Sequence, residues 1–570
     1  MSKYPLPRLA RFVCVCATVY LVSCQGVLPP VPAPVPQKKT NGFGGVLMWK
    51  GDPSESGNYS SETTLTPANV NPSQFGRIGT FQADGIVMAQ PLYVEGVDMG
   101  ASGTHDLVIV ATEHDSIYAF DADDPDGDSL WERHYVDAAN GITTMPDNFG
   151  GRTTVGGEIG ITGTPFIDAT TGVMYFVTIL EDNGTPQQWL RAIDIRTGND
   201  YGPGSMQIAA SVPGDGKGSV NGQIAFDPSI HNNRMGLTEV NGALIIGWSS
   251  FSDYGVYHGW LMAYDPSSLA QLAVFNPTPQ YQAVDAANGI ADHGGGAGIW
   301  QGGAAPAVDA SGYIYLNTAD GSFNADQGGN NYGDSMLKLQ FTGNSFQVVD
   351  WFTPFDAACI DKDDIELGSG GVALLPTAIT NGAKMAMSDD KEGRFFLVNT
   401  DTMGHFNTTA DQIPQEFMIG EFTCTDSTTQ SVSDGPNWNR LYGTASYWNG
   451  NIYAGASNLH LKQYKFENGL LNPTPADMSP TAYGYRGANT VVSSNGAQNG
   501  IVWASEKTVS GLGILHAYDA NAVSHELWNS NMISSRDSIG EGINFAAPVI
   551  ADGHVLIAND KQVNVFGLVQ

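Results

Sequence analysis

Hydrophobic residues occur along most of the chain in short runs of Val, Ile, Tyr and Phe, and these runs are separated by Gly, Asn and Asp. Runs of about four to eight such residues between turn-forming residues are typical of β-strands. Long stretches with the 3.6-residue period of an amphipathic helix are missing. The pattern therefore predicts an all-β protein built from many short strands.

One strand pattern recurs along the chain. In each copy, small or apolar residues lead to an aromatic or aliphatic residue, which is usually followed by Asp or Asn. The copies are Tyr118–Asp121, Arg191–Asp194, Met262–Asp265, Lys338–Gln340, Leu397–Asn399, Gln463–Lys465, His516–Asp519 and Val565–Gly567. Their spacing of about 50–75 residues is that of a four-stranded propeller blade with long loops. We therefore predict an eight-bladed β-propeller. A pair of stacked β-sandwiches is the alternative, but it does not predict eight similar units.

The last repeat lacks one strand. It contains three expected strands, at 546–550, 554–558 and 562–569, and no fourth strand follows them. Residues 75–82, ahead of the first complete repeat, form a strand-like stretch that has no repeat of its own. A closed ring hides the edges of its sheets, so we expect this N-terminal strand to complete the last blade.

The composition fits a large folded protein with an acidic surface. Of 570 residues, 42% are hydrophobic and only 15% are charged. A single core rarely grows beyond about 250–300 residues, so the core must be divided, as it is among the blades of a propeller. The chain has 25 Lys and Arg against 58 Asp and Glu, a net charge of −33. Nucleic acid is excluded as a partner, because phosphate binding depends on Lys and Arg.

The first 44 residues are expected to precede the propeller. Basic residues come before an apolar run at 12–21, which is too short for a membrane-spanning helix and suits a signal peptide. The run ends in Leu21-Val22-Ser23-Cys24, which resembles the lipobox of bacterial lipoproteins, where the Cys becomes the lipidated first residue. We assign 1–23 to the signal peptide, 24–44 to lipidated Cys24 and a Pro-rich linker, and 45–570 to the propeller. An ordinary secretory signal with a chance Cys is the alternative.

This N-terminus predicts a protein of the cell envelope, held at the outer membrane or cell surface, whose only membrane contact is the lipid. The folded body then keeps two cysteines, Cys359 and Cys424. In an oxidising compartment two such cysteines most simply pair. Both lie in loops that join an outer strand to the next inner strand, and such loops emerge on the same face of neighbouring blades. We therefore predict a Cys359–Cys424 disulfide, although their spacing in the sequence does not establish their distance.

The repeats resemble a known family. Ala119-Phe120-Asp121-Ala122-Asp123, followed by Leu130-Trp131, and the stretch from Ala192 to Gly198 are similar to the pyrroloquinoline quinone (PQQ) repeat of quinoprotein alcohol and methanol dehydrogenases. The resemblance covers roughly residues 45–569 and implies the same propeller fold. It says less about chemistry, because one fold can carry many functions.

In that family, PQQ and a Ca²⁺ ion lie at the centre of one propeller face, with a catalytic Asp and a cationic side chain beside them. The resemblance places Glu181 and Asp320 at metal-ligand positions, although the family has Asn where Asp320 stands. It places Glu366 at the catalytic Asp and Lys391 at the cationic position. There, Ca²⁺ would polarise the quinone while a carboxylate takes the substrate proton. The alternative is that these four residues are solvated loop positions of an acidic protein.

The flat contacts that hold the quinone in the family are not matched. The pair of adjacent cysteines that covers one face has no counterpart, because no two cysteines here are neighbours. The tryptophan beneath the other face falls on a Gly, and Trp300 substitutes for it only if the alignment shifts by a few residues. Each lost stacking contact would forfeit roughly 1–3 kcal/mol. The cofactor therefore remains unassigned, with PQQ and Ca²⁺ as the candidates.

Two functions fit these observations. The one we favour is an envelope module that binds a small-molecule ligand or an envelope protein at a polar, cation-capable centre. The alternative is a divergent PQQ- and Ca²⁺-dependent dehydrogenase that oxidises an alcohol or a sugar, with Glu366 as the base and Lys391 polarising the quinone. A Glu in place of the catalytic Asp moves the carboxylate by one methylene, which geometry-sensitive catalysis tolerates badly.

Overall fold

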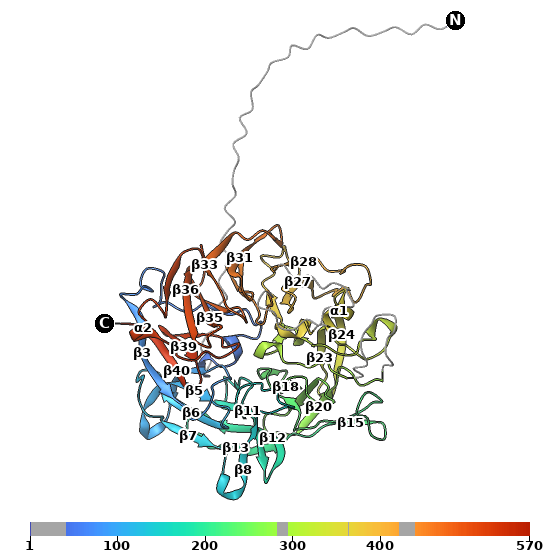
Figure 1. The fold of residues 1–570 in the computed structure, drawn as a ribbon, viewed down its shortest axis with the longest axis horizontal. Helices are drawn as coiled ribbons and strands as arrows, with labels where there is room; N and C mark the ends of the chain where they lie inside the picture. Colours follow the sequence, from blue (N-terminus) through green and yellow to red (C-terminus); the bar gives the residue numbers. More distant parts are fainter. Residues whose placement is uncertain (2–41, 282–294, 363, 421–438, 570) are drawn as a thin grey trace.

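The computed structural model describes residue 1 and residues 42–281, 295–362, 364–420 and 439–569. Eight sheets are arranged as blades around a central axis (Figure 1), so the predicted all-β eight-bladed propeller is confirmed. The α-helices in the described part are α1 (Ala357–Lys362) and α2 (Ser534–Asp537). No helix among the described residues is long and apolar enough to cross a membrane.

Each blade is a mainly antiparallel sheet that runs outward from the axis. The first four blades contain β1 (Gly44–Val46), β4 (Leu92–Asp98), β5 (Thr104–Ala111), β6 (Ser116–Asp121) and β7 (Trp131–His134) in blade 1; β8 (Ile142–Pro146), β9 (Glu158–Ile159), β10 (Phe166–Ile167), β11 (Val173–Asp182), β12 (Thr185–Asp194) and β13 (Asp200–Gln207) in blade 2; β16 (His231–Asn232), β17 (Thr238–Val240), β18 (Ala243–Ser250), β19 (Trp260–Tyr264) and β20 (Gln271–Phe275) in blade 3; and β21 (Ala307–Val308), β22 (Tyr313–Asn317), β23 (Met336–Phe341) and β24 (Phe346–Phe352) in blade 4. A separate hairpin of β14 (Ser211–Pro213) and β15 (Gln223–Ala225) follows blade 2 in the chain and lies beside β20 of blade 3.

The other four blades are built in the same way. They contain β25 (Ala373–Leu375), β26 (Met385–Asp389), β27 (Arg394–Asn399) and β28 (Gln415–Met418) in blade 5; β29 (Ser446–Trp448), β30 (Asn451–Ala454), β31 (His460–Glu467), β32 (Leu470–Leu471) and β33 (Asp477–Ala482) in blade 6; β2 (Asn58–Tyr59), β34 (Asn489–Asn495), β35 (Gln498–Lys507), β36 (Gly513–Asp519) and β37 (Glu526–Asn529) in blade 7; and β3 (Phe75–Gln82), β38 (Val549–Ala551), β39 (His554–Ala558) and β40 (Gln562–Leu568) in blade 8. Short 3-10 helices are η1 (Trp49–Gly51), η2 (Gly100–Ser102), η3 (Ala138–Asn140), η4 (Gln301–Gly303), η5 (Ala325–Gln327) and η6 (Leu367–Ser369).

The recurring sequence pattern lies in the third strand of every blade, from β6 to β40. Its small residue is fully buried in several blades, as at Ala119, Ala192, Ala263 and Ala517. Hydrophobic clusters run from one blade to the next, for example from β5 and β6 of blade 1 to β11 and β12 of blade 2. The core is therefore divided among the interfaces between blades, and small residues let neighbouring sheets approach each other.

The ring is closed by the strand that the sequence predicted. β3 pairs antiparallel with β40, with Phe75 opposite Leu568 and Gln82 opposite Gln562. Phe75 is fully buried and contacts three aromatic rings, those of Trp503, Trp528 and Phe566. The N-terminal strand thus supplies the fourth strand of blade 8 and removes an exposed edge.

An N-terminal segment that the sequence did not reveal runs along the inner ends of the blades. We call residues 43–62 the axial segment. After β1 has paired with β4 of blade 1, carbonyl groups of the segment accept hydrogen bonds from successive inner strands. These bonds run from Ile167 N to Leu47 O (2.9 Å), Val308 N to Pro53 O (2.6 Å), Leu374 N to Ser54 O (2.8 Å), Tyr447 N to Ser56 O (3.0 Å) and Val492 N to Gly57 O (2.7 Å). The segment therefore joins blades 1, 2, 4, 5, 6 and 7 to one another.

Trp49 of the axial segment fills the axis itself. Its side chain is buried and belongs to a cluster with Met48, Ala304, Ala305 and Ala547. The three alanines come from chain segments that lead into blades 4 and 8. The axis is therefore packed at this level by an apolar side chain, which a water-filled pore would not have.

Candidate functional site

Carboxylates from blades 4 and 5 converge near the axis. Asp320 follows β22, and Asp334 lies two residues before β23. Asp361 belongs to α1, and Asp364 and Glu366 lie in the loop that leads from α1 toward β25. In an antiparallel blade, the loop between the second and third strands emerges on the same face as the loop that enters the next blade. The propeller topology therefore brings these residues, far apart in sequence, to one face.

Two groups of these carboxylates have the geometry of a metal site. One ligand oxygen from each of Asp320, Asp334 and Asp361 lies within 4.8 Å of the others, and the same holds for Asp320, Asp364 and Glu366. Because Asp320 belongs to both groups, the five side chains form one continuous cluster, which we call the acidic cluster. Such a set of oxygen donors suits a hard cation such as Ca²⁺, which takes six to eight oxygens.

Two members of the acidic cluster are held by a single backbone contact each. The Gly321 amide donates to Asp361 Oδ1 at 2.7 Å, and the Leu367 amide donates to Asp334 Oδ1 at 3.2 Å. The other oxygen of each carboxylate is buried and has no hydrogen-bond partner among the described residues. A buried carboxylate oxygen without a partner costs free energy of folding. The two unpaired oxygens therefore indicate that a ligand binds here.

The pKa values of the acidic cluster reflect this crowding. Burial raises the pKa of Asp361 to about 7. Burial and the neighbouring carboxylates raise the pKa values of Asp320 and Asp334 well above their usual range. Without a cation, the protein must protonate some of these groups or tolerate their repulsion, and a divalent ion relieves both costs.

The backbone is also strained at this place. Asp334 and Asp364 have φ angles of 45° and 52°, in the left-handed region that side chains other than glycine rarely adopt. Such conformations persist only where the surrounding structure enforces them, and they concentrate at functional sites. Both residues belong to the acidic cluster, so the strain coincides with the candidate metal ligands.

Three of the residues matched by the family resemblance meet beside the acidic cluster. Lys391, which follows β26, places Nζ 2.6 Å from Glu366 Oε2 and 2.6 Å from Asp364 Oδ1. Trp300 Nε1 donates to Glu366 Oε1 at 3.2 Å. Burial raises the pKa of Glu366 to about 8, although the Lys391 charge opposes this rise. Glu366 is therefore held by a cation on one oxygen and by an indole N–H on the other.

Glu181 belongs to the hairpin of blade 2. It is the second-last residue of β11, where it stands opposite Pro186 of β12 and Thr143 of β8. The pairing of β11 with β12 continues to the end of both strands and keeps Glu181 in the hairpin of blade 2. Among the described residues, two groups of carboxylates could share an ion, and Glu181 belongs to neither of them. The geometry instead joins Asp320 to Glu366 and to three acids that the family resemblance did not single out, Asp334, Asp361 and Asp364.

The cysteine predictions fall partly outside the described residues. Cys359 lies in α1, next to the acidic cluster, whereas Cys424 and Cys24 belong to segments that the structure does not describe. The Cys359–Cys424 disulfide and the lipidation of Cys24 therefore remain predictions, as does the division of residues 1–44 into signal peptide and linker.

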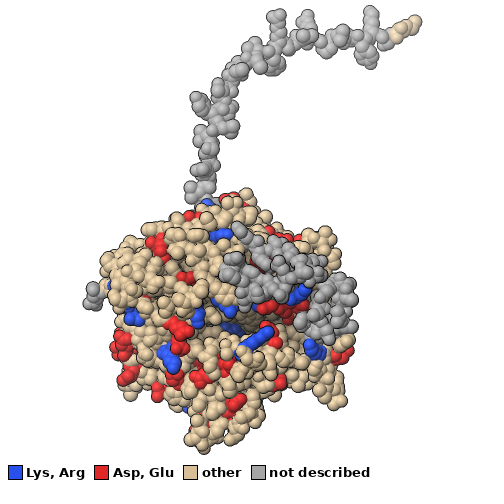
Figure 2. All heavy atoms as spheres, viewed as in Figure 1, with Lys and Arg blue, Asp and Glu red and all other residues tan. Residues whose placement is uncertain are grey.

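The segments that lead into blades 6, 7 and 8 contribute Tyr442, Arg486 and Phe545 to a group of side chains beside Trp300. The ring of Trp300 lies 5.8 Å from that of Phe545, which lies 5.4 Å from that of Tyr442. The Arg486 guanidinium lies 5.0 Å from the Tyr442 ring and 5.8 Å from the Phe545 ring. Figure 2 shows Lys and Arg side chains gathered in the hollow at the middle of this face, beside acidic ones. Sequence reasoning missed Arg486 and Phe545, because single residues in loops carry no pattern.

These residues suit a cation better than they suit a quinone. The unpartnered oxygens of Asp334 and Asp361 match the ligands of a hard ion. Trp300, in contrast, has the Lys391 ammonium 5.6 Å from its ring centroid and meets Phe545 at 68°. An indole engaged in this way does not offer an open flat floor, and no adjacent cysteines exist to cover the opposite face of a quinone.

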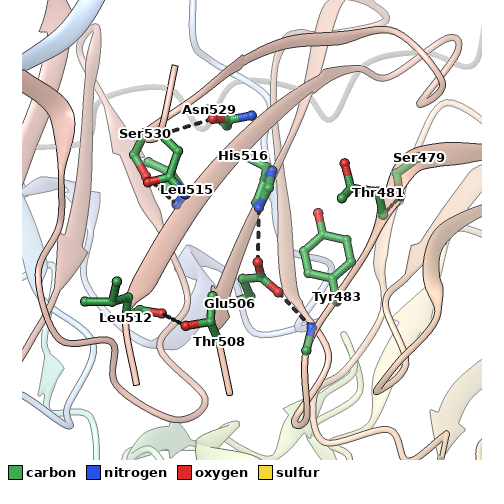
Figure 3. Close-up of polar contacts among 12 residues, drawn as sticks. Ser479, Thr481, Tyr483, Glu506, Thr508, Leu512, Leu515, His516, Asn529 and Ser530 are labelled. Carbon is green, nitrogen blue, oxygen red and sulfur yellow. Dashed lines mark hydrogen bonds and ion pairs between the residues drawn. The ribbon is translucent and has the colours of Figure 1, made fainter. Parts of the chain in front are cut away.

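A second buried polar cluster lies in blade 7 (Figure 3). His516 Nδ1 lies 2.7 Å from Glu526 Oε1, and His516 Nε2 lies 3.6 Å from Glu506 Oε1. Burial lowers the pKa of His516, but the two carboxylates raise it by more, so it lies above the usual value. Tyr483 and Tyr518 share a hydrogen bond at 2.9 Å between their hydroxyls. These contacts tie β35, β36 and β37 together, and we assign them a structural role.

Comparisons with known proteins agree with the fold. No protein-family description matches the sequence, and no curated protein matches it. Among solved structures, a quinohemoprotein alcohol dehydrogenase from Pseudomonas putida matches with a TM-score of 0.56 and 15% identity, over 92% of this chain and 80% of that chain. The quinohemoprotein alcohol dehydrogenase from Comamonas testosteroni gives a TM-score of 0.57 and 14% identity, over 92% and 80% of the two chains.

A europium-containing methanol dehydrogenase is also similar. It has a TM-score of 0.56 and 14% identity, and the match covers 93% of this chain and 99% of that one. Identity at this level shows a common propeller fold and leaves function to be argued from the site. The chain is thus similar in fold to the quinoprotein alcohol and methanol dehydrogenases.

Proposed function

We propose that this chain is a lipid-anchored propeller of the cell envelope that binds a divalent cation at the acidic cluster and, through that cation, a ligand. Ca²⁺ is the ion whose chemistry matches, because every candidate ligand atom is a carboxylate oxygen. The ligand would reach the cation from the hollow at the centre of the face. Asp364 offers an accessible edge of the cluster, since 58% of its side chain is exposed.

The observation that carries this proposal is the pair of buried carboxylates, Asp334 and Asp361, each with one oxygen that lacks a partner among the described residues. A carboxylate on a solvated loop would not be buried in this way. A purely structural acid would be paired with a base or fully hydrogen-bonded. A bound cation supplies the missing partner for both residues at once.

Calorimetric titration of Ca²⁺ into chelator-treated protein tests the proposal. We expect saturable binding by the wild type and at least tenfold weaker binding by Asp361→Asn, because one charged ligand is lost. Asp401→Asn is the matched control, since that carboxylate is exposed and, among the residues that the structure describes, its ion pair is with exposed Lys384. Absence of Ca²⁺ binding by the wild type, or equal binding by Asp361→Asn, would contradict the proposal.

The fold of Asp361→Asn can be checked independently. The wild-type carboxylate is buried among other acids, so without Ca²⁺ the amide removes repulsion and the variant should be at least as stable as the wild type. Ca²⁺ should then raise the midpoint of thermal unfolding of the wild type more than that of the variant. A variant that is less stable without Ca²⁺ would mean that Asp361 serves the fold and not a cation.

The alternative hypothesis is a PQQ- and Ca²⁺-dependent dehydrogenase. It is supported by Glu366, which pairs with Lys391 and shares a group of candidate metal ligands with Asp320. In such an enzyme Glu366 would be the base, Lys391 the cation and Asp320 a metal ligand. This hypothesis is tested by incubating the protein with PQQ and Ca²⁺, followed by gel filtration. If the quinone absorbance stays with the protein together with alcohol-dependent dye reduction, the binding-module proposal is wrong. We expect the quinone to be lost on the column.

The envelope location rests on the N-terminal sequence alone. Intact-mass analysis of the protein purified from membranes should show diacyl or triacyl lipid on Cys24 as the first residue. The Cys24→Ser variant should leave the membrane fraction. A wild-type protein with a lipid-free N-terminus would contradict the anchor without affecting the cation site.

A further inference from the structure

Arg486 differs in its surroundings from Lys391, which pairs with members of the acidic cluster. Lys391 pairs with Glu366 and Asp364. Within the part of the chain that the structure describes, no carboxylate oxygen lies within 4.0 Å of the Arg486 guanidinium. This side chain is surrounded instead by the rings of Tyr485, Tyr442 and Phe545, at 4.6, 5.0 and 5.8 Å from their centroids.

The backbone of Arg486 is strained. Its φ is 98°, an angle that residues other than glycine rarely adopt, and its amide donates to Ser457 Oγ at 3.1 Å. The neighbouring aromatic residue Phe545 also has a positive φ, 65°. A strained, half-buried arginine that is stacked on rings, and that has no carboxylate partner among the described residues, is suited to bind an anion from outside the protein.

Half-exposed rings connect this arginine to the acidic cluster. Trp300 contacts Glu366 through its N–H and approaches Phe545 at 5.8 Å between ring centroids, and Phe545 in turn lies beside Arg486. We call Trp300, Phe545 and Tyr485 the aromatic wall; all three are partly exposed. A molecule bound along these residues could therefore contact a cation at the acidic cluster, the faces of the aromatic wall and the Arg486 guanidinium.

We propose that the ligand of the central site is a polyhydroxylated carboxylate of the hexuronate type. Its hydroxyl oxygens would complete the coordination of the bound cation, the apolar face of its ring would lie on the aromatic wall, and its carboxylate would pair with Arg486. A neutral sugar would leave Arg486 without a partner, and inorganic phosphate could not use the wall. This inference rests on the proposed function, because an anion near five carboxylates needs the cation to offset their charge.

Calorimetric titration of D-galacturonate and D-galactose into the full chain, saturated with Ca²⁺ or treated with chelator, tests the inference. We expect D-galacturonate to bind the Ca²⁺-loaded protein at least tenfold more tightly than D-galactose does, and the chelator-treated protein to bind neither. Arg486→Gln should lose at least tenfold in affinity for galacturonate while keeping its affinity for Ca²⁺ and galactose. Arg486→Lys should lose less, because it keeps the charge. Arg133→Gln, on the outer strand β7, is the control and should match the wild type.

The outcomes separate the two proposals. If Ca²⁺ binds but galacturonate and galactose bind equally, or if Arg486→Gln binds galacturonate as the wild type does, this inference is wrong and the cation site stands. If inorganic phosphate binds as tightly as galacturonate, the site recognises a simple anion and the inference is also wrong. If Ca²⁺ itself does not bind, both proposals fail. Unchanged Ca²⁺ affinity shows that Arg486→Gln is folded, and Phe545→Ala, which should weaken binding of both sugars, tests the wall independently.

Discussion

Closure of the ring by its N-terminal strand can be tested at one side chain, Phe75 of β3. Phe75 is fully buried and lies 5.0 Å from the Trp528 ring at 87° and 5.4 Å from the Trp503 ring. Replacing a buried Phe by Ala costs about 3–5 kcal/mol, and aromatic pairs add about 0.5–1.5 kcal/mol each beyond the area that they bury. We therefore expect Phe75→Ala to lose roughly 4–5 kcal/mol of unfolding free energy, at the upper end of that range.

Equilibrium urea unfolding measures this loss, and hydrogen exchange locates it. The amides of β40 should exchange faster in Phe75→Ala, because β3 pairs along nearly all of β40. Tyr281→Ala is the matched control, since that ring is 59% exposed and its removal should change stability by less than about 0.5 kcal/mol. A loss below about 1 kcal/mol for Phe75→Ala, or unchanged protection of β40, would refute the closing role of β3.

Three further variants test other parts of the structure. Trp49→Ala should cost about 3–5 kcal/mol in urea unfolding, because it empties the packed axis, and a loss below about 1 kcal/mol would mean that the axial segment is dispensable. His516→Gln should lower the free energy of unfolding by roughly 1–3 kcal/mol near pH 6, where His516 is protonated between Glu506 and Glu526. Because folding raises the pKa of His516, this loss should shrink as the pH rises through the folded-state pKa. A loss that does not depend on pH would contradict the ion pairs. Lys391→Met should tighten Ca²⁺ binding about tenfold in calorimetry, because the ammonium competes with the ion for its two carboxylates, and weaker binding would mean that Lys391 orients the ligands instead.

The fold could be predicted largely from local patterns. Each third strand carries its own signature, because a small residue such as Ala119 or Ala517 must fit between two blades. The closing strand was predictable because blade 8 is visibly one strand short. The axial segment was not predictable, because it binds the inner strands through backbone carbonyls such as those of Pro53 and Ser54. Backbone hydrogen bonds of this kind do not depend on which side chains are present, so the sequence pattern does not indicate them.

The candidate site was predictable only in part. Glu366 and Lys391 could be placed from the family resemblance, and the structure brings them to one ion pair. Asp334 was missed because an acid before a strand looks like an ordinary turn residue until the neighbouring blade buries it. Glu181 matched a family position, but it belongs to the long hairpin of β11 and β12 and to neither group of acids that could share an ion among the described residues. Contacts between loops of different blades depend on ring geometry, which local sequence does not encode.

The central claim is that the acidic cluster holds one hard cation, and terbium luminescence tests it most directly, because Tb³⁺ favours the same oxygen ligands and is excited through a nearby indole. Trp300 Nε1 lies 3.2 Å from Glu366 Oε1, so a bound ion would sit beside this ring. With tryptophan excitation, we expect Tb³⁺ emission that saturates at one ion per chain, that excess Ca²⁺ removes, and that Trp300→Phe loses while calorimetry still detects the ion. No sensitised emission from the wild type, or emission that survives both excess Ca²⁺ and Asp361→Asn, would contradict the claim.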